Sequence, residues 1–236
     1  MPEVTLTTTG VAAGGDAIAR DEAGRVVFVE GALPGETVRV AVTGERRDFL
    51  RGRVVEVLAP SPDRVAPPCA EVGRGCGGCP WQGVAVDAQR RLKRDVVVDA
   101  LRRVGRVTSP PVVDSVLSVP ASGYRTSVRV GVVDGRAGYR MRHSHDLVAV
   151  EGCTVAHPLV EELIRQGRFD GCDEVVLRAG ARTGERLVLA RPSAAGVSVP
   201  AGVVVVGEDA PRSRLKRAAF HEVVAGRRWR ISAGSF

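Results

Sequence analysis

The chain has 236 residues, a formal net charge of +7 at neutral pH and an isoelectric point near 9.8, which points to an anionic partner. Hydrophobic residues make up 44% of the sequence and aromatic residues only 4%, which predicts a globular chain with cores of valine, leucine and alanine. No apolar run approaches the length that spans a bilayer, and the N-terminus has no signal-peptide pattern, so we expect a cytoplasmic protein without a membrane partner.

Residues 3–59 contain five short apolar stretches that are separated by glycine-rich turns and show no helical period. Strands are expected at residues 4–7, 17–20, 25–29, 37–42 and 50–58. The third and fourth are expected to pair as a hairpin across the turn at residues 31–35. Short, closely spaced strands of this kind predict a small five-stranded barrel of the oligonucleotide-binding (OB) type over residues 1–60.

Basic and aromatic side chains gather where the last of these strands begins: Arg46, Arg47, Phe49, Arg51 and Arg53. In an oligonucleotide-binding barrel, arginines in this position contact phosphates, and an aromatic ring stacks on a base. The same residues are equally compatible with the solvated tip of a hairpin. The sequence leaves both interpretations open.

A proline-rich connector over residues 61–68 ends the barrel, and three cysteines follow it within eleven positions. They are Cys69, Cys76 and Cys79, and a fourth thiol, Cys153, stands far downstream. Three thiols that are close in sequence can complete a tetrahedral metal site with a fourth one when the chain folds back. This spacing is the strongest chemical signal in the chain.

Several kinds of site use clustered cysteines. A disulfide framework is disfavoured because nothing indicates secretion, and a thioredoxin-like pair is disfavoured because prolines precede the first cysteine. A structural zinc and a [4Fe–4S] cluster both remain, since four cysteines with one short spacing serve either. Gly77 and Gly78 are expected to adopt positive φ around the metal, and Cys172 is expected to be a small buried residue.

Residues 69–230 are expected to form an α+β domain, and the excess of positive charge lies in this region. An apolar face predicts a helix over residues 84–104, and a second helix is expected to begin at Pro158 and to end before Gly167. Strands are expected at residues 112–116, 124–132, 137–141, 174–178 and 186–190.

Several segments resemble one known family, and together they cover essentially the whole chain in order. Residues 31–36, 51–57 and 62–65 resemble the TRAM domain that opens many RNA (uracil-5-)-methyltransferases. The cysteine signature resembles the iron–sulfur domain of those enzymes, and six further residues extend the resemblance: Gln82, Gln89, Lys93, Tyr124, Arg125 and Pro158. Residues 231–236 resemble the segment that enters their catalytic domain.

The resemblance implies that Cys69, Cys76, Cys79 and Cys153 bind a [4Fe–4S] cluster, a choice that spacing alone left open. It also implies a tRNA or rRNA partner and adds Arg125 to the candidate RNA-binding residues. In this family, a thiolate attacks C6 of a uracil that is turned out of its stack, and S-adenosylmethionine methylates C5.

The sequence ends at Phe236 without a βαβ unit that carries a glycine-rich turn, and no cysteine stands in a catalytic context, so we identify no catalytic residue. We therefore expect the OB-like barrel followed by the α+β iron–sulfur domain, truncated at residues 231–236, where a Rossmann-like methyltransferase domain would begin.

The expected function is the N-terminal RNA-binding and [4Fe–4S]-binding portion of an S-adenosylmethionine-dependent RNA (uracil-C5) methyltransferase. Such a portion is expected to be inactive alone, and a separately encoded catalytic domain is a candidate partner. The alternative is a free-standing, non-catalytic RNA-binding iron–sulfur module.

Overall fold

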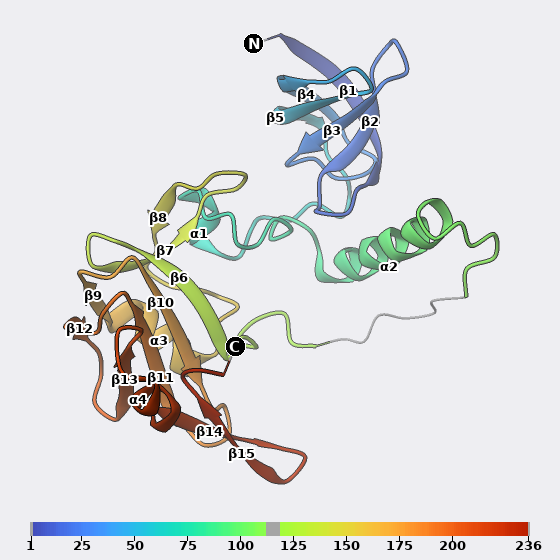
Figure 1. Ribbon diagram of the computed structural model, residues 1–236. Coiled ribbons are helices and arrows are strands. Elements are labelled where there is room, and N and C mark those ends of the chain that lie inside the picture. Colours follow the sequence, from blue (N-terminus) through green and yellow to red (C-terminus); the bar gives the residue numbers. More distant parts are fainter. Residues whose placement is uncertain (1, 112–118, 236) are drawn as a thin grey trace. The chain divides into compact units, whose positions relative to one another are not determined.

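The computed structural model describes residues 2–111 and 119–235, which divide into two compact units (Figure 1). Unit 1 contains residues 1–68 and 80–118, and unit 2 contains residues 69–79 and 119–236. The sequence assigned residues 69–230 to one domain, whereas the chain enters unit 2 at the first cysteines, returns to unit 1 and then enters unit 2 again. The strand expected at residues 112–116 lies outside the described residues.

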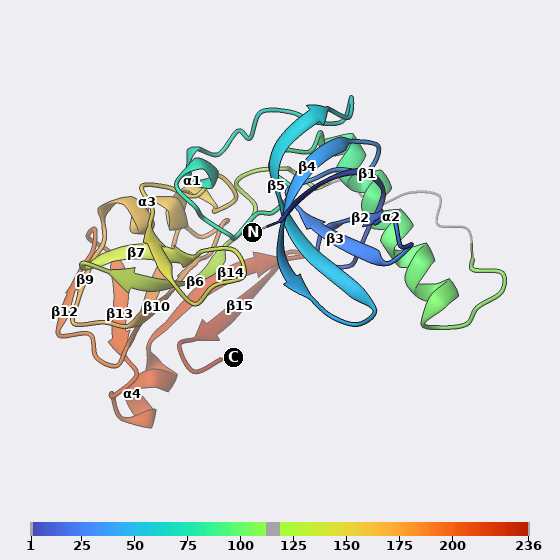
Figure 2. The ribbon, with the colours of Figure 1, turned by 90° about the horizontal axis from the view of Figure 1, so that it is seen from above.

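The first five strands of unit 1 close into a barrel, as predicted (Figure 2). They are β1 (Glu3–Val11), β2 (Ala17–Arg20), β3 (Val26–Glu30), β4 (Thr37–Glu45) and β5 (Phe49–Ala59), in the order β1-β2-β3-β5-β4. The expected hairpin between the third and fourth strands is wrong, because β3 pairs in parallel with β5 while β4 pairs with β1 and β5. The β3–β5 pairing leaves no strand edge of the barrel open.

Alternation along the strands sends one set of side chains into the barrel, where Val27, Val29, Val38 and Val40 are fully buried. Gly52 lies on β5 against this core. A Cβ at Gly52 would lie 2.3 Å from Val40 Cγ1, so the close approach of β4 and β5 requires a glycine here.

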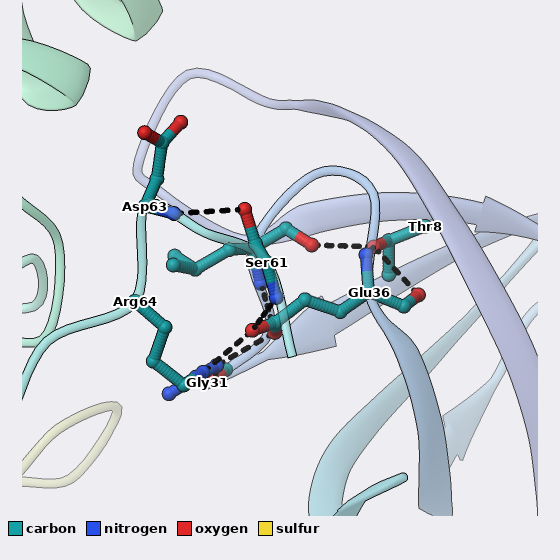
Figure 3. A network of polar contacts seen from close by, with 7 residues as sticks. Thr8, Gly31, Glu36, Ser61, Asp63 and Arg64 are labelled. Atoms are coloured by element: carbon teal, nitrogen blue, oxygen red, sulfur yellow. Dashed lines mark hydrogen bonds and ion pairs between the residues drawn. The ribbon is translucent and has the colours of Figure 1, made fainter. Parts of the chain in front are cut away.

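A buried carboxylate joins the barrel to the connector that follows it (Figure 3). Glu36 is 0% exposed and accepts hydrogen bonds from the backbone N–H groups of Leu33 (2.8 Å) and Ser61 (3.2 Å). Arg64 donates to both of its carboxylate oxygens, from Nε at 2.6 Å and from Nη2 at 2.7 Å. Burial by itself raises the pKa of Glu36, but these hydrogen bonds outweigh it and hold the pKa below its ordinary value.

The connector then pairs with the segment that leads into the long helix α2 (Val86–Arg103). Arg64 and Val84 form an antiparallel bridge, and the N–H of Ala85 donates to the carbonyl of Asp63 at 2.9 Å. Leu33 of the barrel packs with Val84 and Ala88 in a small core. The helix expected at residues 84–104 is confirmed to within two residues at each end.

Unit 2 is built on a six-stranded sheet in the order β13-β11-β10-β6-β7-β8, in which β11 and β13 pair in parallel. The sheet strands are β6 (Ser127–Val133), β7 (Arg136–Arg140), β8 (Leu147–Ala149), β10 (Glu174–Ala179), β11 (Arg186–Arg191) and β13 (Val203–Gly207). Two further pairs join β9 (Arg168–Asp170) to β12 (Gly196–Ser198), and β14 (Ala219–Val224) to β15 (Arg227–Ser232). The helices are α1 (Ala70–Gly73), α3 (Pro158–Gln166) and α4 (Arg212–Arg217).

Both faces of this sheet are covered, so its central strands are apolar on each side. Val175 and Leu177 of β10 join the core formed with α3, and Val176 between them joins a second core with Phe220 of β14. Residues 231–235, which the sequence set apart as the start of a further domain, belong to this second core through Ala233, which is 1% exposed. In the described part of the chain, every helix is too short or too polar to cross a bilayer.

We expect that Arg64→Met will lower the free energy of unfolding of the barrel by about 3 kcal/mol, because it leaves the buried Glu36 carboxylate unpaired. This value is at the lower end of the destabilisation usual for breaking a buried ion pair, because the Arg64 side chain is 29% exposed. Urea unfolding of the full chain in a Trp229→Phe background measures this, since Trp81 of unit 1 is then the only tryptophan.

Arg39→Met is the matched control, because Arg39 pairs with Glu3 and Glu56 on the barrel surface and should contribute less than about 1 kcal/mol.

The folded-state pKa of Glu36 is depressed, so the contribution of this carboxylate to stability is complete above the unfolded-state pKa near 4.5 and is lost as pH falls through the folded-state pKa. The difference between wild type and Arg64→Met should therefore shrink in acid. Equal effects of the two substitutions at neutral pH would refute the special role of Glu36.

Candidate metal centre and nucleic-acid interface

The four cysteines of the sequence signature all belong to unit 2, although they come from two distant segments. Cys69 directly precedes α1, and Cys76 forms an isolated bridge with Met141 just after β7. Cys76 and Cys153 are half-buried and pack against the core beneath α3. The downstream thiol and the upstream group thus both lie in unit 2, where the charge of Cys153 reaches Cys76.

The thiols are close enough to influence one another. Burial raises the pKa of the Cys76 thiol, and the charges of Cys79, Cys69 and Cys153 raise it further, against a lowering hydrogen bond from the Gly78 backbone. No three His, Cys, Asp or Glu side chains in residues 2–111 and 119–235 lie close enough to form a metal site as they stand. The donor set itself suits a thiophilic metal, because a cation would offset the mutual repulsion of four thiolates.

Tyr139 and Glu71 flank the thiols, and sequence patterning identified neither of them. The Tyr139 hydroxyl donates to Cys153 Sγ at 3.5 Å, and burial raises the pKa of this tyrosine far above its ordinary value. Glu71 is 6% exposed; its Oε1 accepts from the Glu151 N–H, while its Oε2 has no hydrogen-bond partner among the residues that the structure describes. Tyr139 lies on a strand 14 residues before Cys153, so no local motif connects the two.

The glycines near the cysteines differ from their expected role. Neither Gly77 nor Gly78 adopts positive φ; Gly75 does, at 99°. Gly77 is required by close packing instead, because a Cβ there would lie 2.5 Å from the backbone nitrogen of Arg142. Cys172 is buried, and its thiol lies 3.3 Å from the Ser193 carbonyl oxygen.

The candidate nucleic-acid contacts of unit 1 centre on Arg51. Its guanidinium carbon lies 5.5 Å from the ring centroid of Phe28 and 5.7 Å from that of Phe49, and the two rings pack edge to face at 5.6 Å. Arg51 also approaches the Asp16 carboxylate at 3.5 Å. Phe28 was missed from the sequence because it reaches Arg51 only through the parallel pairing of β3 with β5.

The other candidate arginines are placed differently. Arg46 and Arg47 are exposed at the β4–β5 turn, and Arg47 approaches Asp48 at 4.0 Å. Arg53 is exposed near Glu30 at 3.9 Å. Arg125 belongs to unit 2, where a hydrogen bond with Tyr124 raises its pKa and Cys79 lies close by.

Comparison with known proteins finds a match to the TRAM domain family at residues 3–55. Over 165 residues, the chain is 44% identical to the 23S rRNA (uracil(1939)-C(5))-methyltransferase of Halomonas elongata, covering 68% of this chain and 34% of that protein. It is 36% identical over 249 residues to an uncharacterized RNA methyltransferase of Streptomyces avermitilis, covering 96% of this chain and 58% of that protein. The chain thus spans at most three-fifths of the length of these two relatives.

A solved structure shares the fold at low sequence identity. It is the tRNA (uracil-54, C5)-methyltransferase of Pyrococcus abyssi in complex with S-adenosyl-L-homocysteine, with a TM-score of 0.61 and 17% identity. The alignment covers 98% of this chain and 60% of that one.

These matches correct two expectations. The expected fold class described a barrel and an iron–sulfur domain set apart from the methyltransferase fold, and it is wrong, because 98% of the chain follows a methyltransferase structure. The expected function, an N-terminal portion inactive alone or a free-standing non-catalytic module, is also wrong, because a relative named an RNA methyltransferase matches 96% of the chain. A separately encoded catalytic partner finds no support in these matches. The sequence motifs were recognised in short segments, whereas the structural match compares the arrangement of the whole chain.

Proposed function

We propose that this chain, which carries a TRAM domain at residues 3–55 and is related in sequence to RNA methyltransferases, acts in methylation of uracil C5 in a tRNA or rRNA. The observation that carries the proposal is that the chain follows a uracil methyltransferase fold over 98% of its length. S-adenosylmethionine as methyl donor is supported by the S-adenosyl-L-homocysteine in that related structure.

The barrel is proposed to bind RNA through the arginines around Phe49. Arg46, Arg47 and Arg53 are exposed and can reach phosphates, whereas Arg51 is held between two phenylalanine rings and Asp16. That arrangement fixes the Arg51 guanidinium as a flat surface on which a base can stack. Arg125 in unit 2 is proposed as a further RNA contact, since it is exposed and carries a full positive charge.

The four thiols are proposed to hold a [4Fe–4S] cluster. The proposal is supported by their gathering around Cys76 and by the hydrogen bond from Tyr139 to Cys153, because hydrogen bonds to cluster sulfurs are a common feature of such sites. When bound, the cluster would cross-link residues 69–79 to Cys153. Methyl transfer needs no electron, so we assign the cluster a structural role in unit 2 and no step of the chemistry.

Protein purified without oxygen should contain about four irons per chain and show the broad visible absorption of a thiolate-bound cluster. Cys153→Ser should lower the iron content severalfold and make unit 2 more sensitive to protease, because the long loop closure is lost. Cys172→Ser is the matched control and should leave the iron content unchanged. Stoichiometric zinc in a colourless preparation would exclude the cluster.

The double variant Arg46→Gln/Arg47→Gln should weaken binding to a fluorescein-labelled tRNA transcript. If each arginine neutralises one phosphate, the slope of log affinity against log salt should fall by about 1.4 to 1.8. Fluorescence anisotropy across a salt series measures both quantities. Arg212→Gln/Arg214→Gln on α4 removes the same charge from an exposed site elsewhere, and an equal effect of this control would count against a barrel interface.

Deleting the gene should remove 5-methyluridine from one position in tRNA or rRNA, which mass spectrometry of digested RNA detects. Reintroducing the wild-type gene or Cys172→Ser should restore the modification, and Cys153→Ser should restore it poorly, because unit 2 would lose its cross-link. Unchanged 5-methyluridine in both RNA classes after deletion would overturn the proposed function.

A further inference from the structure

A hollow of about 390 Å³ lies in unit 1 between the β1–β2 loop and one face of α2. The loop contributes Gly14 and Gly15, and the chain before α2 contributes Trp81. The helix contributes Lys93, Val96 and Val97. The volume of this hollow falls in the size range of small-ligand sites.

The walls of the hollow are fixed by hydrogen bonds. Trp81 Nε1 donates to the Gly15 carbonyl at 3.2 Å, which ties the indole to the barrel loop. Gln89 of α2 donates to the Trp81 carbonyl at 3.1 Å and to the Val84 carbonyl at 2.9 Å. Gly15 has a φ of 96°, and a Cβ there would lie 2.6 Å from Trp81 Nε1, so only glycine allows this contact. The site therefore exists before any ligand arrives.

The lining is apolar except for one charge. Val97 is 49% exposed on a helix that also carries nine charged residues, so it offers apolar surface to a ligand in the hollow. Lys93 is the one charged side chain at the hollow, and it forms no hydrogen bond or ion pair within the described residues. The neighbouring arginines differ, since Arg91 pairs with Asp63 at 2.7 Å and Arg94 with Asp95 at 2.9 Å.

One loop connects the hollow with the arginine surface of the barrel. Asp16 directly follows the Gly14–Gly15 turn, and its carboxylate approaches Arg51, which lies against Phe28 and Phe49. A strand of RNA on the barrel arginines therefore passes the same loop that forms one wall of the hollow. An apolar space beside an unpaired cation suits one nucleotide, whose base is apolar on both faces and whose phosphate is anionic.

We propose that this hollow receives one unstacked base of the bound RNA, against the wall formed by Trp81, Val96 and Val97, and that Lys93 contacts the adjoining phosphate. The inference rests on the proposed RNA-binding function and adds to it a specific nucleotide site outside the barrel. Because it reads a base face and a phosphate and offers no set of hydrogen-bond donors, the site should accept any base.

The test uses the full chain with Trp229→Phe, so that Trp81 is the only tryptophan. Titration with an unlabelled dodecamer of uridylate should quench Trp81 fluorescence to a plateau. A dodecamer with abasic central positions should bind about tenfold more weakly and cause little quenching. Lys93→Gln should weaken binding about threefold or more. Arg102→Gln is the matched control, because Arg102 is exposed, lacks a partner in the described residues and lies nine positions along α2, on the opposite face.

Val97→Phe provides a second test, because it fills the hollow from an exposed position without changing charge. It should abolish the quenching while anisotropy with a labelled dodecamer still detects binding to the barrel. Binding without quenching in the parent protein, or equal losses from Lys93→Gln and Arg102→Gln, would overturn the nucleotide site and leave the barrel interface standing. Absence of RNA binding at low salt would overturn both.

Discussion

The buried carboxylate of Glu36 is the contact on which the organisation of unit 1 depends. A charge that is 0% exposed is tolerated only because two backbone N–H groups and both arms of Arg64 surround it. Those donors come from the barrel turn and from the connector, so the connector contributes to the stability of the barrel. Arg64 also donates to the Gly31 carbonyl at 2.8 Å, which closes the turn over the barrel end.

This contact also fixes the chain on both sides of the cysteine segment. The bridge between Arg64 and Val84 holds the two ends of the segment together in unit 1, while its middle, residues 69–79, packs in unit 2. The cysteine segment is thus a loop whose two ends are held together in unit 1. The charge of Cys153 reaches Cys76 of this segment, and Tyr139 donates to Cys153, so a metal bound by these thiols would join two stretches of unit 2 that are distant in sequence. This geometry supports a structural role for the proposed cluster.

Arginine has two physical roles in this protein. On the barrel, Arg51 is constrained by two rings and Asp16, whereas Arg46 is exposed at the turn. Constrained guanidinium groups favour stacking, and mobile ones favour phosphate contacts that salt weakens. On α2, most arginines are paired with aspartates, whereas Lys93 has no such partner among the described residues and lies at an apolar hollow. The excess of positive charge in the sequence therefore overstates the number of cations that are available to a ligand.

The sequence by itself determined the five barrel strands and the helix that begins at Pro158, because each has a local signature: alternation for the strands and a first-turn proline for the helix. Only the tertiary structure decided that β3 pairs with β5, which brings Phe28 to Arg51, and that Tyr139 reaches Cys153. It also decided that Gly15 meets Trp81. The physical reason is that a local pattern fixes which face of a segment is apolar. Which other segment packs on that face depends on contacts that close long loops. The entropy of closing those loops is not encoded in any short stretch of sequence.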